Sequence, residues 1–143
     1  MAFAFLDHVR NLFEGDPGVR KVADDPVLSA ELLMLFRMIL ADGSVSAAEM
    51  ETFRRICREA FAIPEASIDG VIEYLNEAGY ETTAAQAIVL FRDLPVERRH
   101  ILARHMAAIA KADTHLAANE VRLLKRTLDV LNVDPADIFN GRD

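Results

Sequence analysis

The sequence is poor in the residues that cross-link a chain or interrupt its helices. Its 143 residues include one cysteine, six glycines, five prolines and no tryptophan. The single thiol, Cys57, excludes an internal disulfide framework and any zinc site built from cysteine thiolates. Because Cys57 lies within an apolar helical pattern, we expect it to be buried and to pack as a small hydrophobe.

Long hydrophobic runs are also absent. No apolar stretch approaches the roughly 20 residues that a helix needs to span a bilayer. Residues 1–13 are too polar for a secretory signal peptide, since Asp7, His8, Arg10 and Asn11 interrupt the apolar positions. We therefore expect a cytoplasmic protein whose association with membranes is indirect at most.

Positive charge is in short supply. The chain has 16 Lys and Arg against 23 Asp and Glu, which gives a formal net charge of −7. Nucleic-acid binding depends on a clustered basic surface. The most basic stretch, from Arg92 to Lys111, is interrupted by Asp93 and Glu97. We therefore expect no nucleic-acid partner.

The usual motifs of enzymes are missing as well. The sequence shows no Ser-His-Asp arrangement, glycine-rich phosphate loop or dinucleotide motif. His100 and His105 are five positions apart, so they do not share a helix face as a zinc pair four apart would. A metal-dependent hydrolase would also need a polar substrate pocket, and few polar groups are available to line one. We expect a protein that is not an enzyme.

What the sequence has instead is apolar residues at a period of three to four along most of its length. Hydrophobic residues make up 52% of the chain, and this spacing predicts an all-α fold. The expected architecture is a single compact helical bundle over residues 1–143, with about seven helices. Residues 1–24 supply an N-terminal helix and a linker, and residues 26–139 form the core. We expect helices at about 2–13, 26–41, 47–61, 65–78, 83–91, 95–112 and 117–131, with a short turn at 134–139.

Two predictions concern the ends of these helices. Asp25 suits an N-cap and Pro26 the first helical position, so they start a nearly all-apolar helix that belongs in the centre of the bundle. The segment 18–24, which follows the break at residues 16–18, is polar and is expected to be irregular or to form a short turn.

A short pattern occurs twice and predicts an internal duplication. Residues 41–49 read ADGSVSAAE and residues 112–120 read ADTHLAANE, a shift of 71 residues. The similarity extends into the flanking helices, and its register slips by one residue after Cys57. Each copy is a helix, an acidic turn and a second helix. We call residues 41–49 and 112–120 the two acidic turns.

The acids of these turns have two interpretations. Ser46 and Glu49 have the form of a capping box, in which the glutamate stabilises a helix start; in the second copy Ala117 stands where the serine would be. Alternatively the carboxylates converge on a hard cation such as Ca²⁺ or Mg²⁺, with His115 as a further ligand, although the spacing is not that of an EF-hand. The candidate metal ligands are Asp42, Glu49, Asp113 and Glu120.

These residues resemble the tellurite-resistance TerB-like family over about residues 26–139. The family carries one Ala-Asp-Gly-x-aliphatic-Ser-x-x-Glu turn and a second, related turn near the C-terminus. The resemblance implies an all-α domain with duplicated helical units, an acidic cluster suspected of binding metal ions, and a role in stress responses or as a module attached to other domains. Thr114 departs from the glycine of the first turn and Ala117 from its serine, while four acids match the family: Asp42, Glu49, Asp113 and Glu120.

Two other surfaces bear on partners. Five acids recur every four residues from Glu65 to Glu81. Like charges at this spacing destabilise a helix. Their repulsion must therefore be offset by solvent, by a basic partner, or by Arg98 and Arg99 within the fold. A solvated face is the favoured interpretation. The apolar side of residues 2–13 packs on the bundle or mediates a homodimer.

The leading hypothesis is therefore a non-enzymatic, cytoplasmic, stress-related module. It binds a divalent cation or a cationic partner through the four acids of its turns. The alternative is a pure protein–protein interaction domain, similar to a co-chaperone module, whose turn acids are helix caps. Both hypotheses include a protein partner.

Overall fold

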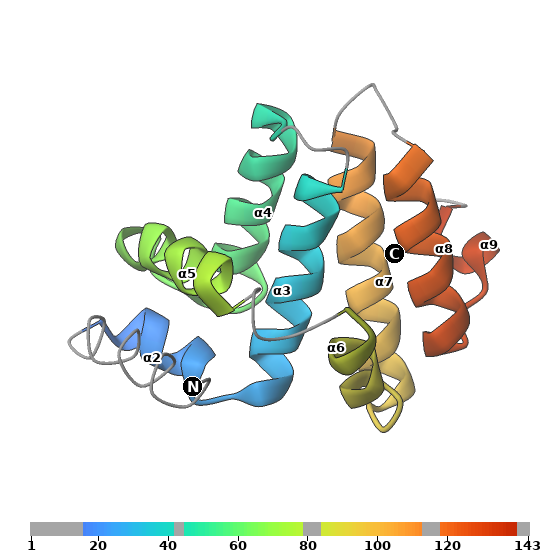
Figure 1. Ribbon diagram of the computed structural model, residues 1–143, viewed down its shortest axis with the longest axis horizontal. Coiled ribbons are helices and arrows are strands. Elements are labelled where there is room, and N and C mark those ends of the chain that lie inside the picture. Colours follow the sequence, from blue (N-terminus) through green and yellow to red (C-terminus); the bar gives the residue numbers. More distant parts are fainter. Residues whose placement is uncertain (1–15, 42–44, 79–83, 113–117, 140–143) are drawn as a thin grey trace.

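The computed structural model describes residues 16–41, 45–78, 84–112 and 118–139, and this part of the chain contains eight α-helices and no strand (Figure 1). The all-α bundle predicted from the sequence is confirmed. The predicted helix at 2–13 lies outside the described residues. None of the described helices is long and apolar enough to cross a bilayer. The helices are α2 Pro17–Ala23, α3 Pro26–Leu40, α4 Ala47–Glu59, α5 Glu65–Ala78, α6 Ala84–Phe91, α7 Val96–Ala112, α8 Ala118–Leu131 and α9 Pro135–Phe139.

Helix α3 is the central element, as its composition predicted. Its N-cap is Asp25, whose carboxylate accepts hydrogen bonds from the N–H groups of Val27 and Leu28, each at 3.1 Å, and Pro26 fills the first turn. Ten of its 15 residues are buried, and it packs against α2 and α4 to α8. A helix that is apolar on most faces is stable only inside such a bundle.

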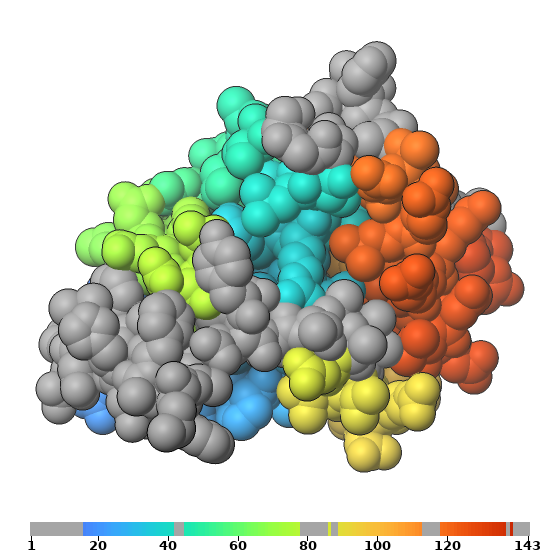
Figure 2. All heavy atoms as spheres, in the orientation of Figure 1, coloured from blue at the N-terminus to red at the C-terminus, as the bar shows by residue number. Residues whose placement is uncertain are grey.

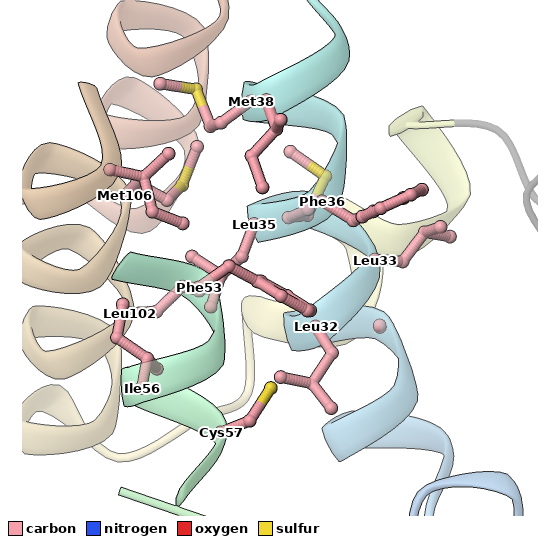
Figure 3. Close-up of a cluster of buried hydrophobic side chains, with 14 of the residues drawn as sticks. Leu32, Leu33, Leu35, Phe36, Met38, Phe53, Ile56, Cys57, Leu102 and Met106 are labelled. Atoms are coloured by element: carbon pink, nitrogen blue, oxygen red, sulfur yellow. The ribbon is translucent and has the colours of Figure 1, made fainter. Parts of the chain in front are cut away.

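The core joins α3 to α4 and α7. Figure 3 shows their side chains pointing toward one another. Phe53 of α4 is fully buried, and its ring centroid lies 6.0 Å from that of Phe36 on α3. Cys57 belongs to this cluster with no exposed surface, and burial raises the pKa of its thiol to about 12. The prediction of a buried thiol is confirmed.

Helix α2 corrects the prediction of an irregular segment at 18–24. Asp16 accepts hydrogen bonds from the N–H groups of Gly18 and Val19 at 3.0 and 3.3 Å, and Pro17 takes the first helical position. These are the same starting residues as in α3, and they begin a helix here too. Ser67 of α5 donates a 2.6 Å hydrogen bond to Asp16, so the cap also docks α2 on α5.

The second helix of each acidic-turn unit ends in a similar way. Ala62 follows α4 and Asn132 follows α8, and both have left-handed backbones, with φ of 54° and 57°. The N–H of Ile63 donates to the carbonyl of Cys57 at 3.0 Å, across six residues. Its counterpart after α8 spans five residues, from 133 to 128, also at 3.0 Å. The extra residue that the sequence alignment requires after Cys57 therefore lies in the last turn of α4, although the duplication itself stays a prediction.

Candidate functional site

The helix ends that flank the two acidic turns lie at the same end of the bundle. Helix α3 ends there at Leu40 and α7 ends there at Ala112, while α4 and α8 begin there (upper part of Figure 1). A hydrogen bond joins the two units, because the side-chain amide of Asn119 donates to the carbonyl of Ala41 at 3.0 Å. The start of α8 is thus fixed to the end of α3.

Both glutamates of the predicted site are buried at this end. Glu49 and Glu120 occupy the third position of α4 and α8, and each is 1% exposed. Ser46 caps α4 as predicted, since its hydroxyl accepts a 3.3 Å hydrogen bond from the N–H of Glu49. A glutamate whose only role is to stabilise a helix N-terminus through the helix dipole is typically exposed at the surface. Burial at both positions places two carboxylates inside the bundle at this end rather than on its surface.

The aspartates of the predicted site, Asp42 and Asp113, lie outside the described residues, as does His115. Among the residues that the structure describes, no group of three or more His, Cys, Asp or Glu is placed to hold a metal ion. The structure therefore positions two of the four candidate ligands. The four-carboxylate site stays a prediction.

The donors that are positioned fit a hard cation. Both are carboxylates, and Ca²⁺ and Mg²⁺ take oxygen ligands. The one thiol of the chain, Cys57, is packed in the core between α3 and α4 and is protonated. A soft thiolate site is therefore excluded at this end of the bundle.

An ion pair with a buried carboxylate was not predicted from the sequence. Glu31 lies in the apolar helix α3 and is 2% exposed. Arg98 of α7 donates two hydrogen bonds to the Glu31 carboxylate, from Nη2 at 2.7 Å and from Nε at 3.2 Å. The bond to Glu31 raises the pKa of the Arg98 guanidinium. A lone acid within an apolar helix was the available signal, but its partner is 67 residues away.

A surface hollow adjoins this pair. It has a volume of about 390 Å³ and is lined by residues that include Phe61, Ile101 and His105. His105 also borders a second hollow of about 300 Å³ beside Ile56. Its ring meets that of Phe61 edge-on, with centroids 5.8 Å apart, and burial lowers the pKa of its imidazole.

The acidic helix α5 obtains its counter-charges from α4. Arg54 pairs with Glu65 at 3.4 Å and also with Asp69, and Arg58 pairs with Glu65 at 2.6 Å. These bonds raise the pKa of both guanidinium groups. The alternative in which α7 supplied the cations is wrong for the described residues, because Arg98 binds Glu31.

Arg99, the other cation considered for that role, is used elsewhere. It donates to the carbonyls of Leu94 and Leu131, at 3.1 and 2.8 Å. It thereby ties the start of α7 to the end of α8. Beyond Asp69, the acidic helix keeps an exposed carboxylate at Glu73, as the favoured solvated-face interpretation predicted.

Comparison with known proteins agrees with this architecture. The sequence model of the family described as "Tellurite resistance protein TerB" matches residues 29–142. No curated protein matches the sequence significantly. A crystal structure of a protein of unknown function from Porphyromonas gingivalis W83 superposes with a TM-score of 0.59 at 24% sequence identity, and the match covers 76% of this chain and 84% of that one. At this identity the likeness shows the fold alone.

Proposed function

Because the chain belongs to the TerB family of tellurite-resistance proteins, we propose that it is a non-enzymatic, cytoplasmic module that binds a divalent cation or a cationic partner through its two acidic turns. The observation that carries the proposal is the burial of Glu49 and Glu120 at one end of the bundle, each 1% exposed. The proposed setting is a stress-response complex with a protein partner.

The proposed ligands combine described and undescribed residues. Glu49 and Glu120 are positioned by the first turns of α4 and α8, and the bond from Asn119 to Ala41 holds the first turn of α8 to the end of α3. Asp42 and Asp113 complete the set. A hard cation held by these carboxylates would fix the two units in one arrangement.

The second candidate is a protein-interaction domain whose turn acids are helix caps. The hydrogen bond between the Ser46 hydroxyl and the N–H of Glu49 favours it for the first turn. In this case an ion does not change the stability of the folded state, and the interaction surface lies elsewhere on the bundle.

A thermal melt distinguishes the two candidates. We would measure Tm in EDTA and in Ca²⁺, Mg²⁺, Mn²⁺ and Zn²⁺, for the wild type and for Asp42→Asn/Asp113→Asn. An ion that binds only the folded state stabilises it by about 2.7 kcal/mol at 100 times its Kd. The proposal expects a concentration-dependent rise that the variant lacks.

The matched control is Glu73→Gln/Glu77→Gln, which removes two acids of α5, away from the turns. It should keep the full rise in Tm. A rise that survives in the turn variant, or no rise with any ion at millimolar concentration, would refute the metal site and leave the interaction domain.

A further inference from the structure

Helices α5 and α8 carry opposite charges on opposite flanks of the molecule. Figure 1 shows α5 on the left and α8 on the right, with α3 and α7 between them, and Figure 2 shows α5 and α8 at the same two flanks of the surface. Each helix has 14 residues and buries one apolar side. Their outward sides are exposed and are strongly charged.

The cationic face of α8 consists of exposed side chains near the middle of the helix. Arg122, Lys125 and Arg126 are spaced so that they share one side of the helix. Within the described chain none of the three forms an ion pair. Asp129 follows one turn later on the same side and is also exposed.

The anionic face of α5 has its uncompensated charge in its second half. Glu65 and Asp69, in the first half, are paired with Arg54 and Arg58 of α4. Glu73 and Glu77 form no ion pair with any described residue. Among the described residues, the cations of one flank and these two acids of the other therefore form no ion pair.

We propose that these two faces bind each other between copies of the chain, with α5 of one copy lying antiparallel to α8 of the next. The antiparallel direction follows from the charge order. Arg122 then faces Glu77, Lys125 and Arg126 face Glu73, and Asp129 reaches the end of α5 where Arg54 and Arg58 gather. The parallel direction would instead place Asp129 beyond Glu77, at the end of α5 that is far from Arg54 and Arg58.

The placement of the faces determines the type of assembly. Since they lie on opposite flanks, each copy can engage two neighbours, and the contact is heterologous rather than two-fold. Exposed ion pairs are individually weak, so we expect association only at protein concentrations of about 0.1–1 mM. The overall charge of −7 opposes it, but at about 0.1 M salt repulsion beyond about 10 Å is screened.

Charge reversal provides the test, measured by sedimentation of the full chain. Lys125→Glu/Arg126→Glu makes both faces acidic, and Glu73→Lys/Glu77→Lys makes both faces basic. Each variant alone should be monomeric. An equimolar mixture should associate, because each variant carries the complement of the other on both flanks.

Matched controls change the same net charge elsewhere. Arg55→Glu/Arg92→Glu and Glu59→Lys/Glu97→Lys alter exposed residues outside the two faces, and they should associate like the wild type. Circular dichroism confirms that each variant is folded. Raising the salt from about 0.1 M to about 1 M should abolish association.

Three results would overturn the proposal. The first is a wild type that stays monomeric at about 1 mM protein and about 0.1 M salt. The second is a mixture of the two reversed variants that stays monomeric. The third is a wild-type mass that stops at the dimer, which would contradict the head-to-tail geometry. None of these results bears on the proposed ion site, since the acidic turns are unchanged in every variant.

Discussion

Breaking the ion pair between Glu31 and Arg98 should destabilise the protein more than any exposed ion pair does. The Glu31 side chain is 3% exposed, whereas that of Arg98 is 41% exposed. Removing one partner of a fully buried pair costs about 3–5 kcal/mol, because a buried charge is left uncompensated. Water reaches the guanidinium side here, which lowers the expectation for Arg98→Met to about 2 kcal/mol.

The assay is urea unfolding followed by far-UV circular dichroism, with the free energy of unfolding extrapolated to water. The variants are Arg98→Met, Glu31→Met and the double variant. Because apolar side chains of similar size replace such pairs at little cost, the double variant should recover most of the loss caused by Arg98→Met. The matched control is Arg54→Met, since its partner Asp69 is exposed and the loss should stay within about 1 kcal/mol.

Two results would refute this reasoning. If Arg98→Met costs less than about 0.5 kcal/mol, the Glu31 carboxylate is solvated despite its burial. If the double variant costs the sum of the two single changes, the residues are not coupled. A change in the denaturant dependence, rather than in the midpoint, would mean that the fold itself has loosened.

Three further predictions concern single positions. Gly18→Ala should lower the free energy of unfolding by about 1–2 kcal/mol, although alanine has the better helix propensity, because the new Cβ would overlap Ser67. Urea unfolding should show a smaller loss when the same change is made in a Ser67→Gly background. An equal loss would contradict the overlap. Burial lowers the pKa of the His105 imidazole in the folded chain. Below pH ~6.5 the unfolded chain therefore binds a proton that the folded chain does not, and the free energy of unfolding decreases as the pH falls. His105→Gln should flatten that dependence in unfolding curves between about pH 5 and 7, and an unchanged slope would assign it to other groups. Cys57, with no exposed surface and a pKa raised to about 12, should react with a thiol reagent only at the rate of unfolding, and faster labelling would disprove its burial.

The features that could be predicted from the sequence are those fixed by neighbouring residues. Asp25 and Pro26 start α3, and Ser46 caps α4, because each cap needs only a side chain and an N–H two or three positions away. The apolar period placed most of the helices, and the all-apolar composition placed α3 in the centre. Such signals do not depend on the rest of the fold.

The features that were missed depend on residues far apart in the sequence. Helix α2 has seven residues, too few to be stable alone, and its cap binds Ser67, 51 positions away. Arg54 and Arg58 reach the acids of α5 only because α4 packs beside it. Arg98 and Arg99 of α7, which were one alternative for this role, bind Glu31 and the carbonyl of Leu131 instead, and periodicity alone does not reveal such contacts.

The candidate metal site itself stays a prediction, and only the placement of the helices around it can be compared with the sequence. The repeated pattern predicted that two acidic turns could meet, and the structure places the ends of their helices together. The burial of Glu49 and Glu120 was not foreseen, because a capping glutamate and a buried one have the same sequence signature. The roles of Asp42 and Asp113 stay predictions.

The bond between Asn119 and Ala41 has a consequence for amide hydrogen exchange. The bond joins two residues that are 78 positions apart in the sequence. Fraying of the last turn of α3 is therefore coupled to fraying of the first turn of α8 through this one contact. Ends of helices normally open independently and at low free energy. Here we expect opening at one end to weaken the other by about the contribution of one hydrogen bond, ~1 kcal/mol, so that amide protection in the last turn of α3 and in the first turn of α8 is coupled.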